Sequence, residues 1–129
     1  MGEIFYKLRI NGNDRTSVVN AFLDTGSTHN VIRYDLPDGK LTLDLAIFYD
    51  ENGAKDMEVI GNKEPQTLGT VLFNSIEIGG ITIRDPKYTT FILENIGDDA
   101  IIGFPLMQYL EMVLDFRMNK DTAQINYHK

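Results

Sequence analysis

The segment Ala21-Phe22-Leu23-Asp24-Thr25-Gly26-Ser27-Thr28 places an acidic residue, a glycine and hydroxyl side chains directly after an apolar run. Asp24 is therefore expected to be partly buried, where a carboxylate needs hydrogen bonds or a shared proton. Gly26 allows a sharp turn and leaves its amide free to face that carboxylate. These features make Asp24 a candidate for acid–base chemistry. The same residues also fit an ordinary turn between two strands, with Asp24 as an Asx-turn residue.

A second informative segment is Ala100-Ile101-Ile102-Gly103-Phe104-Pro105-Leu106-Met107. The apolar residues before Gly103 predict a buried strand, and Pro105 suits the first turn of a helix. By itself, the segment is an ordinary strand–helix junction. It gains interest from its order and spacing relative to the Asp24 segment.

Short strands dominate the predicted structure, because apolar and polar residues alternate and turn residues recur at short intervals. We expect strands at residues 4–10, 17–23, 31–32, 41–49, 71–78, 81–83 and 87–93. The one helix expected begins at Phe104-Pro105, and residues 113–116 and 123–127 are expected to form a closing hairpin. These elements predict an all-β fold that is closed or nearly closed.

The composition fits one globular domain spanning residues 1–129. The net charge of −7 argues against a nucleic-acid binder, which usually needs a basic face. Cysteine is absent from the sequence, which excludes disulfide scaffolds and cysteine-ligated metals. No signal-type segment and no apolar run of membrane-spanning length occurs. We therefore expect a soluble, cytoplasmic protein that binds neither nucleic acid nor membrane.

In order and spacing, the two segments resemble the retropepsin family of single-domain aspartic proteases. That family has an apolar-apolar-Asp-Thr/Ser-Gly loop and, near its C-terminus, an apolar-Ile/Leu-Gly strand followed by a short helix. Here these motifs are Phe22-Leu23-Asp24-Thr25-Gly26 and Ile101-Ile102-Gly103. The similarity is looser elsewhere: residues 68–80 look like the strand pair after the family's flap, and Asp115 looks like part of its last core strand.

The resemblance implies a closed retropepsin-like β-barrel with one short C-terminal helix, acting as a C2 homodimer. The sequence contains a single Asp-Thr-Gly, so one chain would hold half a site and two Asp24 carboxylates would meet on the two-fold axis. The implied activity is that of an aspartic endopeptidase, in which the carboxylate pair shares a proton and activates a water molecule. No cofactor and no metal are implied.

The same resemblance implies roles for the neighbours of Asp24. Thr25 would lock the two loops together across the axis, and Gly26 would present its backbone to substrate. Ser27, Ile102 and Gly103 would support the catalytic loop. Ser27 is expected to donate a hydrogen bond to the ionised carboxylate, which would favour an acidic activity optimum. Alternatively, Ser27 is only a small turn residue.

Substrate is expected to lie under a flap within residues 56–69, with Gly61, Asn62 and Lys63 at its tip. The alternative is an ordinary solvated hairpin. Thr28 and His29 are expected to line neighbouring subsites, and His29 fits equally well as a plain surface histidine. The net charge of −7 is expected to disfavour acidic substrates and to favour basic or apolar ones.

The sequence also departs from the family pattern. Viral members often pair an acidic residue just after the catalytic loop with an arginine after the second glycine, and here those positions hold Thr28 and Phe104. The dimer must therefore be held otherwise, and the edges of the first strand (residues 3–10) and the last strand (residues 124–127) are the candidates. A non-catalytic dimerisation or peptide-binding module with the same fold is the competing function.

Overall fold

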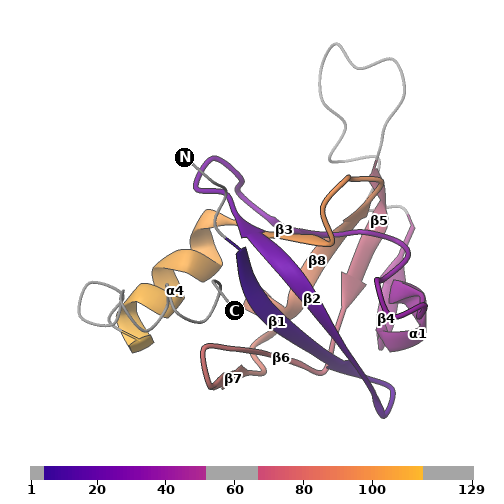
Figure 1. The fold of residues 1–129 in the computed structure, drawn as a ribbon, viewed down its shortest axis with the longest axis horizontal. Coiled ribbons are helices and arrows are strands. Elements are labelled where there is room, and N and C mark those ends of the chain that lie inside the picture. Colours follow the sequence, from indigo (N-terminus) through magenta and orange to yellow (C-terminus); the bar gives the residue numbers. More distant parts are fainter. Residues whose placement is uncertain (1–4, 52–66, 115–129) are drawn as a thin grey trace.

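Within residues 5–51 and 67–114, which the computed structural model describes, nine strands form one mixed sheet with three helices beside them (Figure 1). The strands are β1 (Phe5–Gly12), β2 (Arg15–Leu23), β3 (Asn30–Ile32), β4 (Phe48–Asp50), β5 (Thr67–Leu72), β6 (Ser75–Ile78), β7 (Ile81–Ile83), β8 (Thr90–Glu94) and β9 (Ala100–Ile102). The helices are α1 (Thr42–Leu45), α3 (Pro86–Thr89) and α4 (Phe104–Leu114).

The β1–β2 hairpin follows directly from the sequence pattern. The two strands pair antiparallel along the whole of β1. The apolar side chains that alternate along β1 are buried, namely Tyr6, Leu8 and Ile10. Asn13 and Asp14 form the turn with φ of 52° and 59°, values that asparagine and aspartate tolerate better than most residues.

The strands are ordered β4-β5-β8-β3-β9-β2-β1-β6-β7. The end strands β4 and β7 do not pair with each other, so the sheet of the described residues is open and the closed barrel predicted for it is wrong. Each end strand has only three residues and offers few backbone groups for closure. Of the expected closing hairpin, Val113 and Leu114 are instead the last residues of α4, and the rest lies outside the described residues.

The strand expected at residues 41–49 is a short helix followed by a shorter strand. Thr42 and Leu45 of α1 are buried on one side of a helical turn, which the alternation of leucines in the sequence does not reveal. The Thr42 hydroxyl donates to the Arg33 carbonyl oxygen, and the Asp44 carboxylate accepts from Leu41 N at 3.3 Å. These local hydrogen bonds favour the helix, so β4 begins only at Phe48.

The strand expected at residues 71–78 is broken in two. β5 pairs with β8, whereas β6 pairs with β1. The change of partner occurs at Phe73 and Asn74, whose amides donate to Thr89 O at 3.1 Å and Asn11 O at 2.9 Å. An unbroken run of strand-forming residues therefore serves two different neighbours.

Residues 87–93 likewise contain a helix before their strand. Asp85 caps α3 by accepting a hydrogen bond from Lys87 N at 2.9 Å, and Pro86 occupies the first helical position. The expected strand therefore begins at Thr90, as β8.

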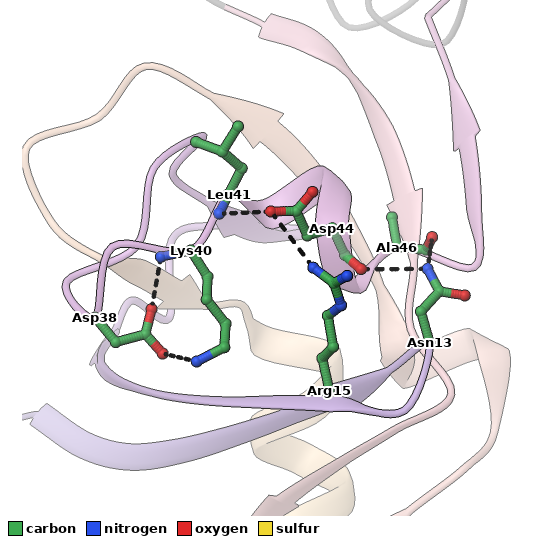
Figure 2. A network of polar contacts seen from close by, with 7 residues as sticks. All are labelled: Asn13, Arg15, Asp38, Lys40, Leu41, Asp44 and Ala46. Atoms are coloured by element: carbon green, nitrogen blue, oxygen red, sulfur yellow. Dashed lines mark hydrogen bonds and ion pairs between the residues drawn. The ribbon is translucent and has the colours of Figure 1, made fainter.

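Polar contacts fasten the tip of the β1–β2 hairpin to α1 (Figure 2). Asn13 Nδ2 donates to Ala46 O at 2.8 Å and to Asp44 O at 3.3 Å. Arg15 reaches the Asp44 carboxylate at 3.9 Å. Since only Ala46 and Ile47 separate α1 from β4, these contacts hold the chain just before β4 begins.

The core of the described residues joins the sheet to α1 and α4. Its largest fully buried side chains include Leu45 of α1, Leu106 of α4, and Phe73 and Phe91, whose rings meet edge to face at 5.5 Å between centroids. Among the described residues, no helix is long and apolar enough to cross a membrane.

Candidate active site

Residues 24–29 connect β2 to β3, and β9 lies between those two strands. β2 pairs with β9 in parallel, with Leu23 opposite Ile102, and β3 pairs with β9 antiparallel, with Val31 opposite Ile101. The connecting loop therefore passes over the end of β9, just before Gly103. This topology brings together the two segments that the sequence analysis singles out.

Two backbone hydrogen bonds fasten the loop to the end of β9. Asp24 N donates to Ile102 O at 3.0 Å, and Phe104 N donates to Ser27 O at 2.8 Å. The first bond continues the β2–β9 ladder by one residue, and the second joins the loop to the first residue of α4. The position of Asp24 is thus set by the sheet and by the start of the helix.

Gly103 approaches the loop so closely that a side chain does not fit. A Cβ built on Gly103 would lie 2.6 Å from the carbonyl oxygen and 2.8 Å from the carbonyl carbon of His29. Both are backbone atoms, so the loop itself would have to move. The glycine that the sequence analysis assigned to loop support therefore meets a steric requirement.

Asn30 is a site residue that the sequence analysis missed. It is buried, its Oδ1 accepts from Gly103 N at 3.0 Å, and its Nδ2 donates to Tyr88 O at 3.0 Å. Since one partner is a donor and the other an acceptor, the orientation of the side-chain amide is fixed. The signal in the sequence was a polar residue directly before the apolar pair Val31-Ile32.

Asp24 is half-buried, and one of its carboxylate oxygens is engaged. Gly26 N donates to Oδ1 at 2.9 Å, and Ser27 N donates to the Asp24 carbonyl oxygen at 3.1 Å. A Cβ on Gly26 would lie 3.3 Å from the same Oδ1, so the small residue allows this approach. Oδ2 accepts no hydrogen bond from the described residues and is available to water or to a second carboxylate.

The two hydroxyl groups of the turn do not contact this carboxylate in the described part of the chain. Thr25 is exposed and makes no hydrogen bond there. Ser27 Oγ donates to His29 O at 2.6 Å. A hydroxyl has a single proton to donate, so the predicted bond from Ser27 to Asp24 is absent and that prediction is wrong. The alternative interpretation, in which Ser27 shapes the turn, agrees with this contact.

Thr28 and His29 are exposed and line a cavity of about 220 Å³ beside the loop. Thr28 Oγ1 lies 2.9 Å from His29 Nδ1, and this contact orients the imidazole ring. Lys87 and Pro105 form another part of the cavity wall. Both residues expected to line a subsite therefore face a hollow next to the Asp24 turn.

The expected flap tip, formed by Gly61, Asn62 and Lys63, lies outside the described residues. The strands that precede and follow this segment, β4 and β5, pair antiparallel with Phe48 opposite Leu72. The chain thus leaves along one arm of a hairpin and returns along the other.

Tyr49 links these two arms. Its hydroxyl donates to Leu68 O at 2.8 Å, and Gly69 passes so close that a Cβ there would lie 2.6 Å from a ring carbon. Partial burial and, second, the charge of Glu51 raise the pKa of Tyr49 above its ordinary value of 10.0. The hydroxyl therefore stays protonated at neutral and acidic pH and keeps its hydrogen bond.

The chemistry available at this site is that of one half-buried carboxylate. Among the described residues, no three His, Asp or Glu side chains gather closely enough to hold a metal ion. What one chain contributes is therefore a carboxylate with an available oxygen, next to a cavity.

Residues 6–106 match the family model of the aspartyl proteases, and the chain belongs to that family. A comparison with curated protein sequences finds no match. Among solved structures, the chain is similar to the retroviral protease-like domain of Ddi1 from Leishmania major, with a TM-score of 0.60 and 19% identity over 92% of this chain and 86% of that chain. The mostly-β, retropepsin-like fold is thereby confirmed, together with the resemblance that the Asp24 and Gly103 segments predicted.

Proposed function

We propose that this chain is an aspartic endopeptidase that works as a C2 homodimer, with one Asp24 from each subunit in the active site. The observation that carries the proposal is the Asp24 turn, in which Gly26 N holds one carboxylate oxygen while the other is available. Hydrolysis of this kind needs two facing carboxylates, and the sequence contains one Asp-Thr-Gly. A second copy of the chain is the simplest source of the other.

Two carboxylates in contact cannot both ionise, so the Asp24 pair holds one proton and titrates as a unit. The ionised carboxylate takes a proton from a water molecule as the water oxygen attacks the scissile carbonyl carbon. The protonated carboxyl of the other subunit polarises the carbonyl oxygen. A proton then passes to the leaving nitrogen, the peptide C–N bond breaks, and a carboxylic acid and an amine are released.

Two features beside the turn support a two-fold arrangement. Thr25 is exposed, so its hydroxyl is available to the partner's loop. Phe104 is 44% exposed, and an apolar ring at this place is a surface that a second chain can cover. The first strand is a weaker interface candidate than the sequence suggests, because β6 already pairs with β1 at residues 9–11. Residues 124–127 lie outside the described residues.

Substrate is proposed to lie extended between the Asp24 pair and the β4–β5 hairpin, where a peptide can add a strand. Thr28 and His29 would then contact side chains on either side of the scissile bond. The flap tip at Gly61, Asn62 and Lys63 and the cytoplasmic location both stay predictions.

The test compares the wild type with Asp24→Asn on a diverse peptide mixture between about pH 3 and 7, with cut sites read by mass spectrometry. Asparagine keeps the size of the side chain and can still accept from Gly26 N, so the fold is expected to persist. Cleavage by the wild type alone, blocked by a statine-type inhibitor, supports the proposal. Equal cleavage by both proteins would contradict a catalytic role for Asp24.

The competing function is a non-catalytic dimerisation or peptide-binding module. A paired, partly buried carboxylate is costly, and a pure binding module gains little from keeping one. A wild-type protein that is shown to be dimeric, and that still cleaves no peptide in the mixture, would favour the module.

A further inference from the structure

The cavity beside the Asp24 turn has walls from three separate segments. Thr28 and His29 come from the loop itself, Pro86 and Lys87 from α3, and Pro105 and Leu106 from the first turn of α4. None of the described residues that line it is acidic. The cavity measures about 220 Å³, which is large enough for one amino-acid side chain and too small for a folded element.

Lys87 is the cationic residue of this lining, and it also lines an adjoining cavity together with Tyr88. Its side chain has no carboxylate within 4.0 Å among the described residues, and its Nζ lies 5.6 Å from the centroid of the Tyr88 ring. The nearest acid along the chain, Asp85, uses its carboxylate to accept from the backbone amide of Lys87. Glu111 lines an adjoining cavity with Lys87 but forms no ion pair with it.

His29 adds a second polar group that faces the same cavity. The contact with Thr28 occupies its Nδ1, so Nε2 is the ring nitrogen left for a ligand. Nε2 has no hydrogen-bond partner among the described residues. An ammonium and an imidazole on one cavity wall, without an acid, suit a carboxylate.

The distance from Asp24 defines which substrate residue can reach this cavity. Thr28 and His29 line the cavity and follow Asp24 in the same loop, whereas Asp24 itself does not line it, so the cavity lies beside the carboxylate and not at it. An extended peptide advances about 3.3 Å per residue. A side chain that reaches the cavity is therefore expected to stand away from the scissile bond, roughly two to four residues along the peptide.

The net charge of −7 predicts the opposite preference, for basic or apolar substrates. Charges farther away than about 8 Å are largely screened at physiological ionic strength, so the groups that line the cavity decide its preference. Here those groups are Lys87 and His29.

We infer that this cavity is a specificity subsite for an acidic side chain, aspartate or glutamate, two to four residues from the cleaved bond. The inference rests on the proposed protease function. An exposed ion pair of this kind corresponds to a preference of about three- to fivefold in kcat/KM for glutamate over glutamine.

The test uses peptide pairs that differ only by Glu or Gln at each of these positions, built around a cut site of the wild-type protein. The ratio of kcat/KM for Glu over Gln is measured at about pH 6, where a free glutamate is ionised. Lys87→Gln should lower the ratio to about one, and Lys87→Glu should invert it. Because each ratio is taken within one preparation, partial unfolding of a variant does not change it.

Arg84→Gln is the matched control, because Arg84 is exposed, lies three residues away and lines none of the cavities described above. It removes the same charge and should keep the wild-type ratio. A wild-type ratio near one at every position would contradict the acidic subsite but not the proposed protease function. An equal fall of the ratio in Lys87→Gln and Arg84→Gln would do the same. If the wild-type protein cleaves no peptide at all, the proposed function itself has failed.

Discussion

Gly103 is the residue at which the two halves of the site touch, and it allows a sharp prediction. Gly103→Ala would place a Cβ 2.6 Å from His29 O, so either the loop or β9 must shift. We expect a loss of about 1–3 kcal/mol in the free energy of unfolding, and a much larger fractional loss of peptide cleavage.

Gly97→Ala is the control for this change, since a Cβ at Gly97 meets no atom of the described part of the chain within 4 Å. Urea denaturation and peptide cleavage are measured for both variants. Near-identical behaviour of the two would mean that the close approach at Gly103 does not position the loop.

A substitution of Ser27 tests which contacts stabilise the turn, and not which groups take part in catalysis. Because the Ser27 hydroxyl donates to His29 O, Ser27→Ala should leave the acidic limb of the pH–rate profile where it is. It should cost about 1 kcal/mol of stability through the lost hydrogen bond. An acidic limb that moves to higher pH in the variant would show that the hydroxyl serves the Asp24 carboxylate after all.

Among single residues, the sequence predicts those whose role follows from the residue type and its place in the chain. Asp24, Gly26 and Gly103 belong to that group. The buried amide of Asn30 does not, because its two partners are 58 and 73 residues away in the chain. The partner of the Ser27 hydroxyl also depends on how the loop is folded back, which no local pattern specifies.

Among the elements, the turn that precedes α1 contains a carboxyl group, that of Asp38, whose charge stabilises the fold. Burial opposes the charge of Asp38, but hydrogen bonds from Lys40 N and Ser17 Oγ, together with the Lys40 ammonium at 3.2 Å, outweigh it and lower the pKa of this carboxyl. A carboxyl whose pKa is lower in the folded state stabilises the fold above its unfolded pKa. That contribution is lost as the pH falls through the folded value, which lies below 3.8.

Asp38→Asn should therefore cost up to about 1 kcal/mol at pH 6, since the pair is exposed. The difference from wild type should shrink steadily below about pH 4. Urea denaturation at a series of pH values measures both. A difference that stays constant down to pH 3 would mean that the side chain acts through its hydrogen bonds alone and not through its charge.

Element types were predictable where buried and exposed side chains alternate along most of a strand. β1 and β2 are such strands, and α4 begins at Phe104 as expected. Residues 41–49 and 87–93 were mistaken for strands because their apolar and β-branched residues also fit a single helical turn. In both places a local hydrogen bond decides, from Leu41 N to the Asp44 side chain and from Lys87 N to Asp85.

For the molecule as a whole, two short segments of the sequence are enough to predict the family. They do not predict whether the sheet closes into a barrel. The end strands β4 and β7 are separated by seven others, and no sequence pattern fixes whether such ends meet. The net charge likewise does not predict which charged residues line a single cavity. The chain carries −7 overall, yet the described lining of the cavity beside the Asp24 turn contains Lys87 and His29 and no acidic residue.

A shared active site is tested most directly by mixing subunits. A fixed amount of wild-type chain is refolded from denaturant with increasing amounts of Asp24→Asn, and the rate of peptide cleavage is measured. Because only a dimer of two wild-type chains has both carboxylates, random pairing predicts about half of the starting activity at one equivalent and about one-tenth at nine. Activity that does not change as the variant is added would contradict a site built from two Asp24 residues.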